Sequence, residues 1–288
     1  MGEIRLGVLL GAEDRAQSFD VASFSIGALG IGSWQHQTGS IYLVNSSNNA
    51  NSVHSSDQGL VIETNSAFDY FIRYPIRADT VSRYGPYITQ HTIRALAWGR
   101  VTTAQDSGRI SLQLLLTTGE FNAGFPFNTI LSRVEIIRTD VLSSGTFPLI
   151  DIDAQNVSSL CTLLLDDVLV CADEQVLTPN WELNQREVLL ASRSTSLGGR
   201  SSIVRWGGYN GFTIPLDYVP SSVADLFHHW WRIQAPCLFT LDTSDENACW
   251  PVRIVNQQTP LGGYRRPYST LRSGALELQS IHAQTLVF

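Results

Sequence analysis

The sequence predicts an all-β fold, mainly antiparallel, in which a β-sandwich domain is followed by a small β-sandwich or barrel module flanked by one α-helix. Three observations lead to this prediction. Apolar and polar residues alternate with a period of two in many segments, as in RISLQLLL (109–116), and such alternation is typical of half-buried strands. Turn-rich segments separate these short runs at fairly even spacing. A single stretch has the spacing of an amphipathic helix.

The expected strands follow one another along the whole chain. They are SIYLV (40–44), GLVIE (59–63), YFIRYPI (70–76), RALAWGR (94–100), RISLQLLL (109–116), RVEIIRTDV (133–141), CTLLLDDVLVC (161–171), SIVRWG (202–207), GFTIPL (211–216), CLFTLDT (237–243), PVRIVN (251–256) and ALELQSI (275–281). The turn-rich segments include NSSNNANSVHSSDQG (45–59), TTGEFNAGFPFN (117–128), DTSDENA (242–248) and TPLGGYRRP (259–267). Many short strands joined by such turns favour an antiparallel sandwich or barrel over a βαβ fold.

The expected helix covers about residues 222–232, within VADLFHHWWRIQAP (223–236). Its apolar residues fall at i, i+3, i+4, i+7 and i+8, which places them on one stripe; they are Val223, Leu226, Phe227, Trp230 and Trp231. Ser222 is the expected N-cap, with Asp225 completing a capping-box-like pair. We therefore expect Trp230 and Trp231 to anchor the helix on the C-terminal sheet.

A domain boundary is expected near TPNWELNQ (178–185), where turn residues interrupt the strand pattern. The sequence thus predicts a sandwich domain over residues 1–180 and the helix-bearing β module over residues 181–288.

Charge and hydropathy exclude two classes of partner. The 288-residue chain has a formal net charge of −7, whereas nucleic-acid binders usually carry a basic patch, so we expect no sequence-specific nucleic-acid partner. No apolar run is long enough for a membrane-spanning helix and the N-terminus lacks a secretory signal. We therefore expect a soluble protein that is not exported and does not insert into a membrane. All 19 basic residues are Arg, which suits subunit interfaces, although a bias in genomic base composition is the preferred explanation.

The sequence contains few signs of catalysis or metal binding. It has no G-x-S-x-G, H-E-x-x-H or P-loop motif. His228 and His229 point about 100° apart on a helix, whereas a zinc pair needs the i, i+4 spacing. The cysteines form no C-x-x-C motif, so free buried thiols are favoured, and pairing of Cys237 with Cys249 across a hairpin stays open. We expect no metal and no cofactor.

One carboxylate pair has the spacing that acid/base chemistry could use. Asp151 and Asp153 would share one face of a strand, as paired carboxylates do in glycoside hydrolases. Capping of turns by the Asp side chains is the favoured interpretation, so we do not expect an enzyme.

Two segments of the N-terminal part, TLLLDDVLVC (162–171) and RALAWGRVTTAQDSGRISLQLL (94–115), resemble strands of jelly-roll carbohydrate-binding modules. The resemblance implies a jelly roll over residues 1–180, with aromatic side chains on its concave face stacking on sugar rings. The corresponding residues are Trp98, Tyr84, Tyr87 and Trp34. It also makes Asp167 a candidate calcium ligand, without matching partner ligands. Packing of these aromatics in the core or between the sheets is the favoured interpretation.

The C-terminal part resembles a second family. GFTIPL (211–216), the helix with WW, CLFTLDT (237–243), PVRIVN (251–256) and TPLGG (259–263) are similar in order to the tube-like modules of distal tail and hub proteins of long-tailed bacteriophages. The resemblance implies a virion structural protein of the tail tip, or baseplate, made in the host cytoplasm. It would form a ring, as a hexamer, and join the tail tube and tail hub to the host-adsorption apparatus. His228 and His229 are then candidates for the subunit contact.

Three functions remain open at this point. The leading hypothesis is the ring-forming tail-tip subunit, with a host-surface saccharide as a further partner. The alternative is a glycan-binding, lectin-like module, since a surface low in charge suits neutral sugars; only 16% of the residues are charged. A β-scaffold glycoside hydrolase that uses Asp151 and Asp153 comes third.

Overall fold

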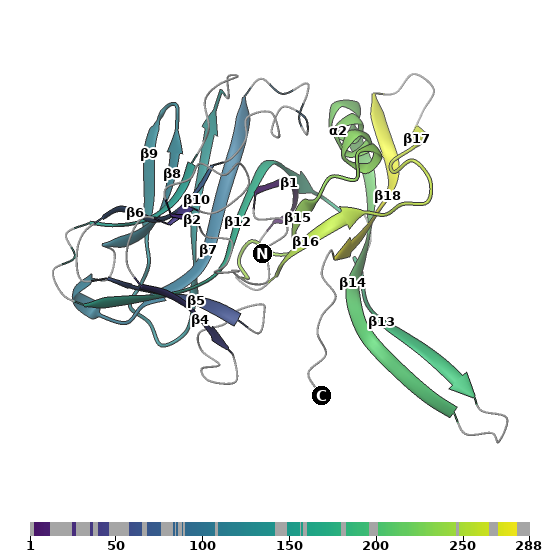
Figure 1. The fold of residues 1–288 in the computed structure, drawn as a ribbon. Helices are drawn as coiled ribbons and strands as arrows, with labels where there is room; N and C mark the ends of the chain where they lie inside the picture. The colour runs from purple at the N-terminus through teal and green to yellow at the C-terminus, as the bar shows by residue number, and fades with distance from the viewer. Residues whose placement is uncertain are drawn as a thin grey trace. The chain divides into compact units, whose positions relative to one another are not determined.

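The computed structural model divides the chain into two compact units (Figure 1). One unit is Leu9–Glu174, and the other combines Met1–Val8 with Gln175–Phe288. The structure describes residues 3–11, 25–26, 35–36, 40–45, 58–64, 68–75, 83, 85, 88, 90–106, 109–141, 149–155, 157, 160–179, 183–195, 201–245, 248–264 and 270–280. The strands are almost all antiparallel, which confirms the predicted all-β fold class.

The division differs from the predicted one at the N-terminus. The sequence places residues 1–8 in the first domain, whereas the structure groups them with the C-terminal unit. The reason is strand β1 (Ile4–Gly11), which pairs antiparallel with β15 (Cys237–Thr240) in the register Arg5↔Thr240 to Val8↔Cys237. A pairing across more than 200 residues has no local signal in the sequence.

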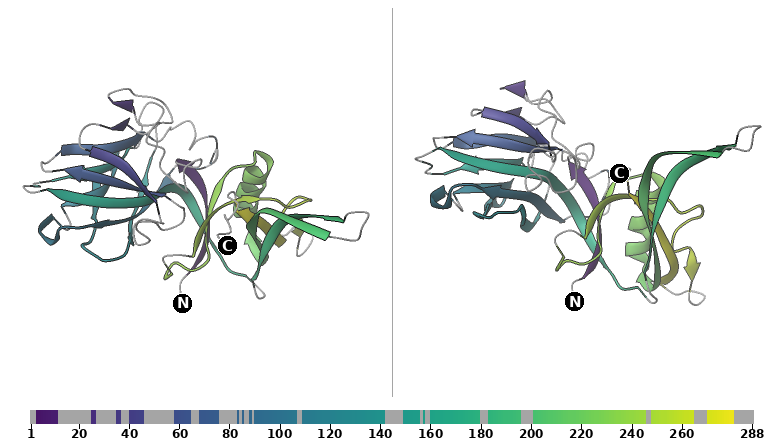
Figure 2. Two further views of the ribbon diagram at one scale, coloured as in Figure 1. Left: turned by 60° about the horizontal axis from the view of Figure 1, so that its bottom comes forward. Right: turned by 90° about the horizontal axis from the view of Figure 1, so that it is seen from below.

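The unit Leu9–Glu174 contains two groups of hydrogen-bonded strands (Figure 2). The first holds β4 (Ser40–Asn45), β5 (Gln58–Thr64), β12 (Cys161–Leu177), β7 (His91–Val101) and β10 (Ser132–Asp140), paired in that order. The second holds β2 (Ser25–Ile26), β3 (Gln35–His36), β6 (Phe68–Pro75), β11 (Leu149–Ala154), β8 (Ile110–Leu116) and β9 (Gly119–Gly124). A short 3-10 helix, η3 (Ala104–Asp106), precedes β8.

The core of this unit depends on small residues in β7. A Cβ atom added at Gly99 would lie 2.5 Å from the ring of Phe125, so only glycine lets that ring pack against the strand. Phe125 is fully buried, as are Ile110, Leu112 and Leu114 of β8. The alternation seen in the sequence therefore puts the apolar residues of β8 on one face, and Ser111 and Gln113 on the other face are buried as well.

The second unit has one sheet, ordered β1, β15, β16 (Cys249–Ile254), β18 (Leu271–Ser280), β14 (Ser201–Pro220) and β13 (Asn184–Thr195). The two-residue β17 (Gly263–Tyr264) pairs with β18. Segments 202–207 and 211–216, predicted as two strands, form the single continuous strand β14. The expected strands did not include β1, β2, β3, β9, β11, β13 and β17. Of these, β9 and β17 fall within segments that were expected to be turns.

Helix α2 (Ser221–Arg232) confirms the predicted helix. Ala224, Phe227 and Trp230 are buried, and the rings of Phe227 and Trp230 lie 5.5 Å apart. The predicted cap is wrong: Pro220 is the N-cap and no side chain caps the helix. The reason is that β14 runs directly into α2, so Ser222 already lies inside the helix.

Strands β13 and β14 form a hairpin that extends beyond the rest of their sheet (Figure 1). They pair from Asn184↔Thr213 to Thr195↔Ser201, whereas β18 pairs with β14 only from Gly211 to Pro220. The outer part of the hairpin therefore has two strands, and a two-stranded hairpin is marginally stable by itself.

Candidate functional site

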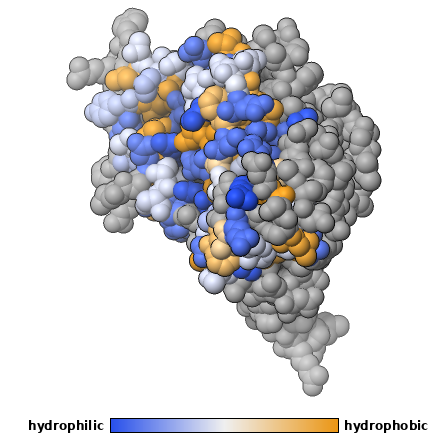
Figure 3. Space-filling view, turned by 90° about the vertical axis from the view of Figure 1, so that its left-hand side faces the viewer, coloured by the Kyte–Doolittle hydropathy of each residue, from blue (hydrophilic) through white to orange (hydrophobic). Residues whose placement is uncertain are grey.

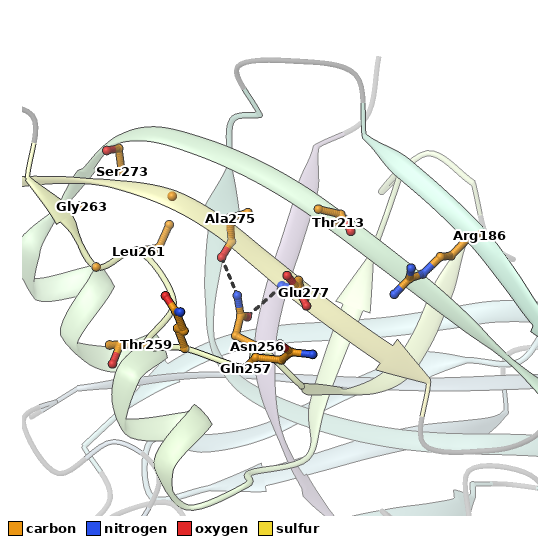
Figure 4. Close-up of a pocket in the computed structure, with 13 residues that line it drawn as sticks. Arg186, Thr213, Asn256, Gln257, Thr259, Leu261, Gly263, Ser273, Ala275 and Glu277 are labelled. Carbon is orange, nitrogen blue, oxygen red and sulfur yellow. Dashed lines mark hydrogen bonds between the residues drawn. The ribbon is translucent and has the colours of Figure 1, made fainter.

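An open groove of about 1070 Å³ lies on the sheet of the second unit (Figure 4). It is lined by side chains with amide, hydroxyl and charged groups and by several small residues; these are Arg186, Thr213, Asn256, Gln257, Gln258, Thr259, Leu261, Gly262, Gly263, Ser273, Gly274, Ala275 and Glu277. Thr213 and Glu277 are register partners on β14 and β18. They alternate with the buried Ile214, Leu276 and Leu278, so the groove uses the uncovered face of these strands.

One wall of the groove is held in place by Asn256. Its Nδ2 donates to the Ala275 carbonyl at 3.0 Å, and its Oδ1 accepts from the Glu277 amide at 2.9 Å (Figure 4). The Asn256 carbonyl in turn accepts from Nε1 of Trp231 in α2 at 3.0 Å. The segment that follows β16 is thus fixed to both β18 and α2, so the wall is preorganised.

The other end of this wall depends on Gly274, which has φ +150. A Cβ atom there would lie 3.0 Å from the Cα and 3.1 Å from the backbone nitrogen of Leu261. Leu261 is itself buried, and the neighbouring Pro260 carbonyl is hydrogen-bonded by Nε2 of His228. Glycine is therefore required both for the backbone conformation and for the close approach of the wall.

Arg186 reaches the groove from β13. It pairs with Gly211 of β14, where a Cβ atom would lie 3.1 Å from the Arg186 Nε and 3.2 Å from its Cγ. The absence of a side chain at position 211 thus lets the Arg186 stem lie across the sheet. Within the described residues, the Arg186 guanidinium and the Glu277 carboxylate form no ion pair or hydrogen bond.

The chemistry of the groove is that of hydrogen bonding. Its free side chains supply amide, hydroxyl, guanidinium and carboxylate groups. None of the described side chains that line it is aromatic. No group of three His, Cys, Asp or Glu residues in the described part of the chain is placed to hold a metal ion. None of the described helices is long and apolar enough to cross a membrane.

Asp151 and Asp153 lie on strand β11, in the first unit, and not in a turn, which corrects the favoured interpretation. Asp151 accepts from Arg73 Nε at 2.7 Å and from Nη2 at 2.5 Å. Asp153 accepts from the Ser111 hydroxyl and, at 3.0 Å, from Gln155. Burial raises the pKa of both carboxyl groups, although these hydrogen bonds oppose the rise. Both carboxylates are buried and already accept hydrogen bonds from neighbouring side chains, which indicates a structural role.

A second buried cluster joins β7 to its neighbours. Arg94, 1% exposed, donates to Glu135 at 2.9 Å and to Glu174 at 2.8 Å. Nδ1 of His91 lies 2.8 Å from Asp173. Each charged group here has a partner within the cluster, which indicates a structural role.

The predicted stacking residues do not form a platform in the described structure. Trp98 is 1% exposed, because both faces of β7 are covered, so its ring offers no surface to a sugar. Tyr84, Tyr87 and Trp34 lie outside the described residues, and so does the side chain of Asp167.

The predicted interface and cysteine residues are placed as follows. His228 and His229 are half-buried on α2, and His228 is engaged with Pro260, so a subunit contact through them stays a prediction. Cys237 and Cys249 are free thiols, which confirms the favoured interpretation, and burial raises the pKa of Cys237.

Sequence reasoning missed the groove, because its residues come from four separate strands and one loop. The available signal was QQT (257–259), a short amide- and hydroxyl-rich run before TPLGG.

The described surface of the molecule has scattered apolar side chains. Figure 3 shows hydrophobic residues interspersed with hydrophilic ones on the face turned to the left in Figure 1. The exposed large hydrophobic residues of the described part are Phe127, Ile130, Ile137, Val141, Leu160, Val176, Tyr218 and Val255. Scattered exposure of this kind is normal for a folded protein.

No protein-family model matches the chain. No curated protein matches it either.

Among solved structures, the chain is similar to the CBM22-1 xylan-binding domain of Paenibacillus barcinonensis Xyn10C, with 8% identity over 59% of this chain and 95% of that one, and a TM-score of 0.30. It is also similar to the CBM22-1-CBM22-2 tandem of the same protein (10%; 75% and 65%; TM-score 0.31). A third structure is the botulinum neurotoxin serotype D/C VPI 5993 binding domain (9%; 75% and 72%; TM-score 0.26). At these TM-scores the likenesses carry no argument about function.

Proposed function

We propose that this protein is a non-enzymatic glycan-binding protein whose groove on β14 and β18 receives a saccharide. The observation that carries the proposal is the preorganised groove with free hydrogen-bonding side chains. Within the described residues, Thr213, Gln257, Thr259 and Ser273 have no side-chain partner of their own. A ligand with many hydroxyl groups would satisfy such donors and acceptors together.

The position of the groove favours a saccharide over an extended peptide. Its floor is the face of two paired strands, whose backbone groups are already hydrogen-bonded to each other. A peptide that adds to a sheet binds the backbone of a free edge. Recognition on a sheet face must instead use side chains. The volume of about 1070 Å³ lies just above the usual range for ligand pockets, about 300–1,000 Å³.

The test is binding of the full chain to a glycan array, followed by titration calorimetry with each saccharide that binds. Glu277→Gln and Thr213→Val should each weaken binding several-fold without changing the melting temperature. Arg232→Ala, a change at an exposed residue of α2, is the control and should bind as the unaltered protein does. Equal affinity of all these proteins would show that the saccharide binds elsewhere.

The second candidate function is the ring-forming subunit of a phage tail tip. It is favoured by the β13–β14 hairpin, whose outer part has two strands (Figure 1). Such a hairpin gains stability when it packs on another surface, and in a closed ring one heterologous contact serves every subunit. Such a protein would be located in the virion tail.

Light scattering and negative-stain images of the purified chain test this candidate. Rings, with hexameric symmetry expected, would support it. Replacing residues 189–207 with a short Gly-containing turn should then release monomers. A protein that stays monomeric at micromolar concentration would argue against the tail-tip role.

A further inference from the structure

The groove is chemically asymmetric along its length. Arg186 lies at one end of the view in Figure 4, Glu277 lies nearer the middle, and Thr259, Leu261 and Ser273 lie toward the other end. Of the described residues that line the groove, Arg186 and Glu277 are the charged ones. A ligand that fits both must therefore present different groups at the two positions.

Arg186 is arranged to present its guanidinium rather than to pair within the chain. Its stem lies over Gly211, where a Cβ atom would come within 3.1 Å of Nε. It forms no ion pair within the described residues, although Glu187 follows it directly on β13. A planar guanidinium with free N–H groups matches the oxygens of a carboxylate or sulfate in two parallel hydrogen bonds.

Glu277 limits how much negative charge the ligand can carry. Its carboxylate accepts hydrogen bonds and repels anions, so a neutral sugar unit with hydroxyl donors fits beside it. The net charge of −7 also opposes the approach of a long polyanion. The same groove thus favours one anionic group at one end and neutral hydroxyl groups along the rest.

We propose that the ligand of this groove is an acidic oligosaccharide with one carboxylated or sulfated unit at the Arg186 end and neutral units beside Glu277. This inference rests on the proposed glycan-binding function and adds the chemical class of the saccharide. Arg186 binds the anionic group, and Gly211 acts as a positioning residue that lets the guanidinium lie across β14.

The experiment compares matched probes on the full chain by titration calorimetry at low and high salt. The probes are a trisaccharide ending in glucuronic acid, its glucose-ended counterpart, and the same glucose-ended trisaccharide carrying one sulfate. We expect the two acidic probes to bind about tenfold more tightly than the neutral one at low salt, with the ratio falling at high salt.

Three variants locate the effect. Arg186→Gln should bring the acidic probes down to the affinity of the neutral probe while leaving the neutral affinity within twofold. Gly211→Ala keeps the charge but displaces the Arg186 stem, so it should reduce the acidic preference in part. Arg232→Gln, which removes an exposed charge on α2 instead of on the sheet face that carries the groove, should leave the preference unchanged. Unchanged melting temperatures show that each variant is folded.

The outcomes separate this inference from the proposed function. Equal binding of acidic and neutral probes, unaffected by Arg186→Gln, would overturn the acidic-ligand inference and leave glycan binding intact. No binding of any saccharide would overturn the proposed function itself. Tighter binding of heparin than of the singly charged probes, or equally tight binding of an acidic peptide, would also overturn the inference, because both indicate a general attraction for anions.

Discussion

Arg73 of β6 donates two hydrogen bonds to Asp151 of the neighbouring strand β11, at 2.7 Å from Nε and at 2.5 Å from Nη2. The Asp151 side chain is 0% exposed and the Arg73 side chain is 24% exposed. Burial of the Asp151 carboxylate therefore depends on the ion pair with Arg73, because a buried carboxylate without a counter-charge is strongly disfavoured.

Arg73→Met should lower the free energy of unfolding by about 3–5 kcal/mol, the usual cost of leaving one member of a buried pair alone. The double variant Arg73→Met with Asp151→Leu should recover most of that loss, because neither charge remains. Urea denaturation of the single and double variants measures both effects. A double variant no more stable than Arg73→Met would contradict the assigned pair.

Asp153 should make stability depend on pH in a defined direction. Burial raises the pKa of this carboxyl group in the folded protein, so on raising the pH the unfolded chain loses its proton first. Between the unfolded and the folded pKa the folded state binds more protons, so its stability falls as the pH rises. Asp153→Asn removes this titration. The free energy of unfolding of the variant, relative to that of the unaltered protein, should therefore increase as the pH rises from about 4.

The measurement is denaturant unfolding of both proteins at several pH values. A stability difference for Asp153→Asn that stays flat, or that shrinks with rising pH, would rule out the raised pKa.

The two adjacent tryptophans of α2 should respond differently to substitution. Trp230 is 1% exposed, so Trp230→Ala should cost about 3–5 kcal/mol of unfolding free energy. Trp231 is half-buried and donates to Asn256, so Trp231→Phe should cost about 0.5–1.5 kcal/mol for the lost hydrogen bond. Thermal and urea unfolding measure both values. Equal costs for the two changes would contradict their assigned environments.

Gly274→Ala should disturb the groove through the backbone. The positive φ and the approach of Leu261 to 3.0 Å from the added Cβ both oppose a side chain, at a cost of about 1–3 kcal/mol. Gly262→Ala is the nearby control, since its φ is not in the positive range and its Cβ would meet one backbone oxygen at 3.2 Å. If Gly274→Ala unfolded at the same urea concentration as the control, the strain that we assign to a side chain at position 274 would be disproved.

Local periodicity determined the elements that the sequence predicted well. The apolar stripe of VADLFHHWWR placed α2 within one residue of its observed start, and period-two alternation located β8, β10 and β18. Both patterns depend only on the geometry of a single element, so they need no knowledge of its neighbours. The all-β class follows from the same alternation.

The tertiary structure decided which faces are covered and which strands pair. In β7, Leu96 and Trp98 are buried together with Ala95 and Ala97, so alternation could not show that Trp98 is inaccessible. Strand β1 pairs with β15, although the two are far apart in the chain. Arg186 and Glu277 are also far apart in the chain, and both line one groove. The sequence by itself determined the local elements, because side-chain periodicity is a property of each strand or helix. The folded chain alone decided the site, because a groove exists only where distant elements meet.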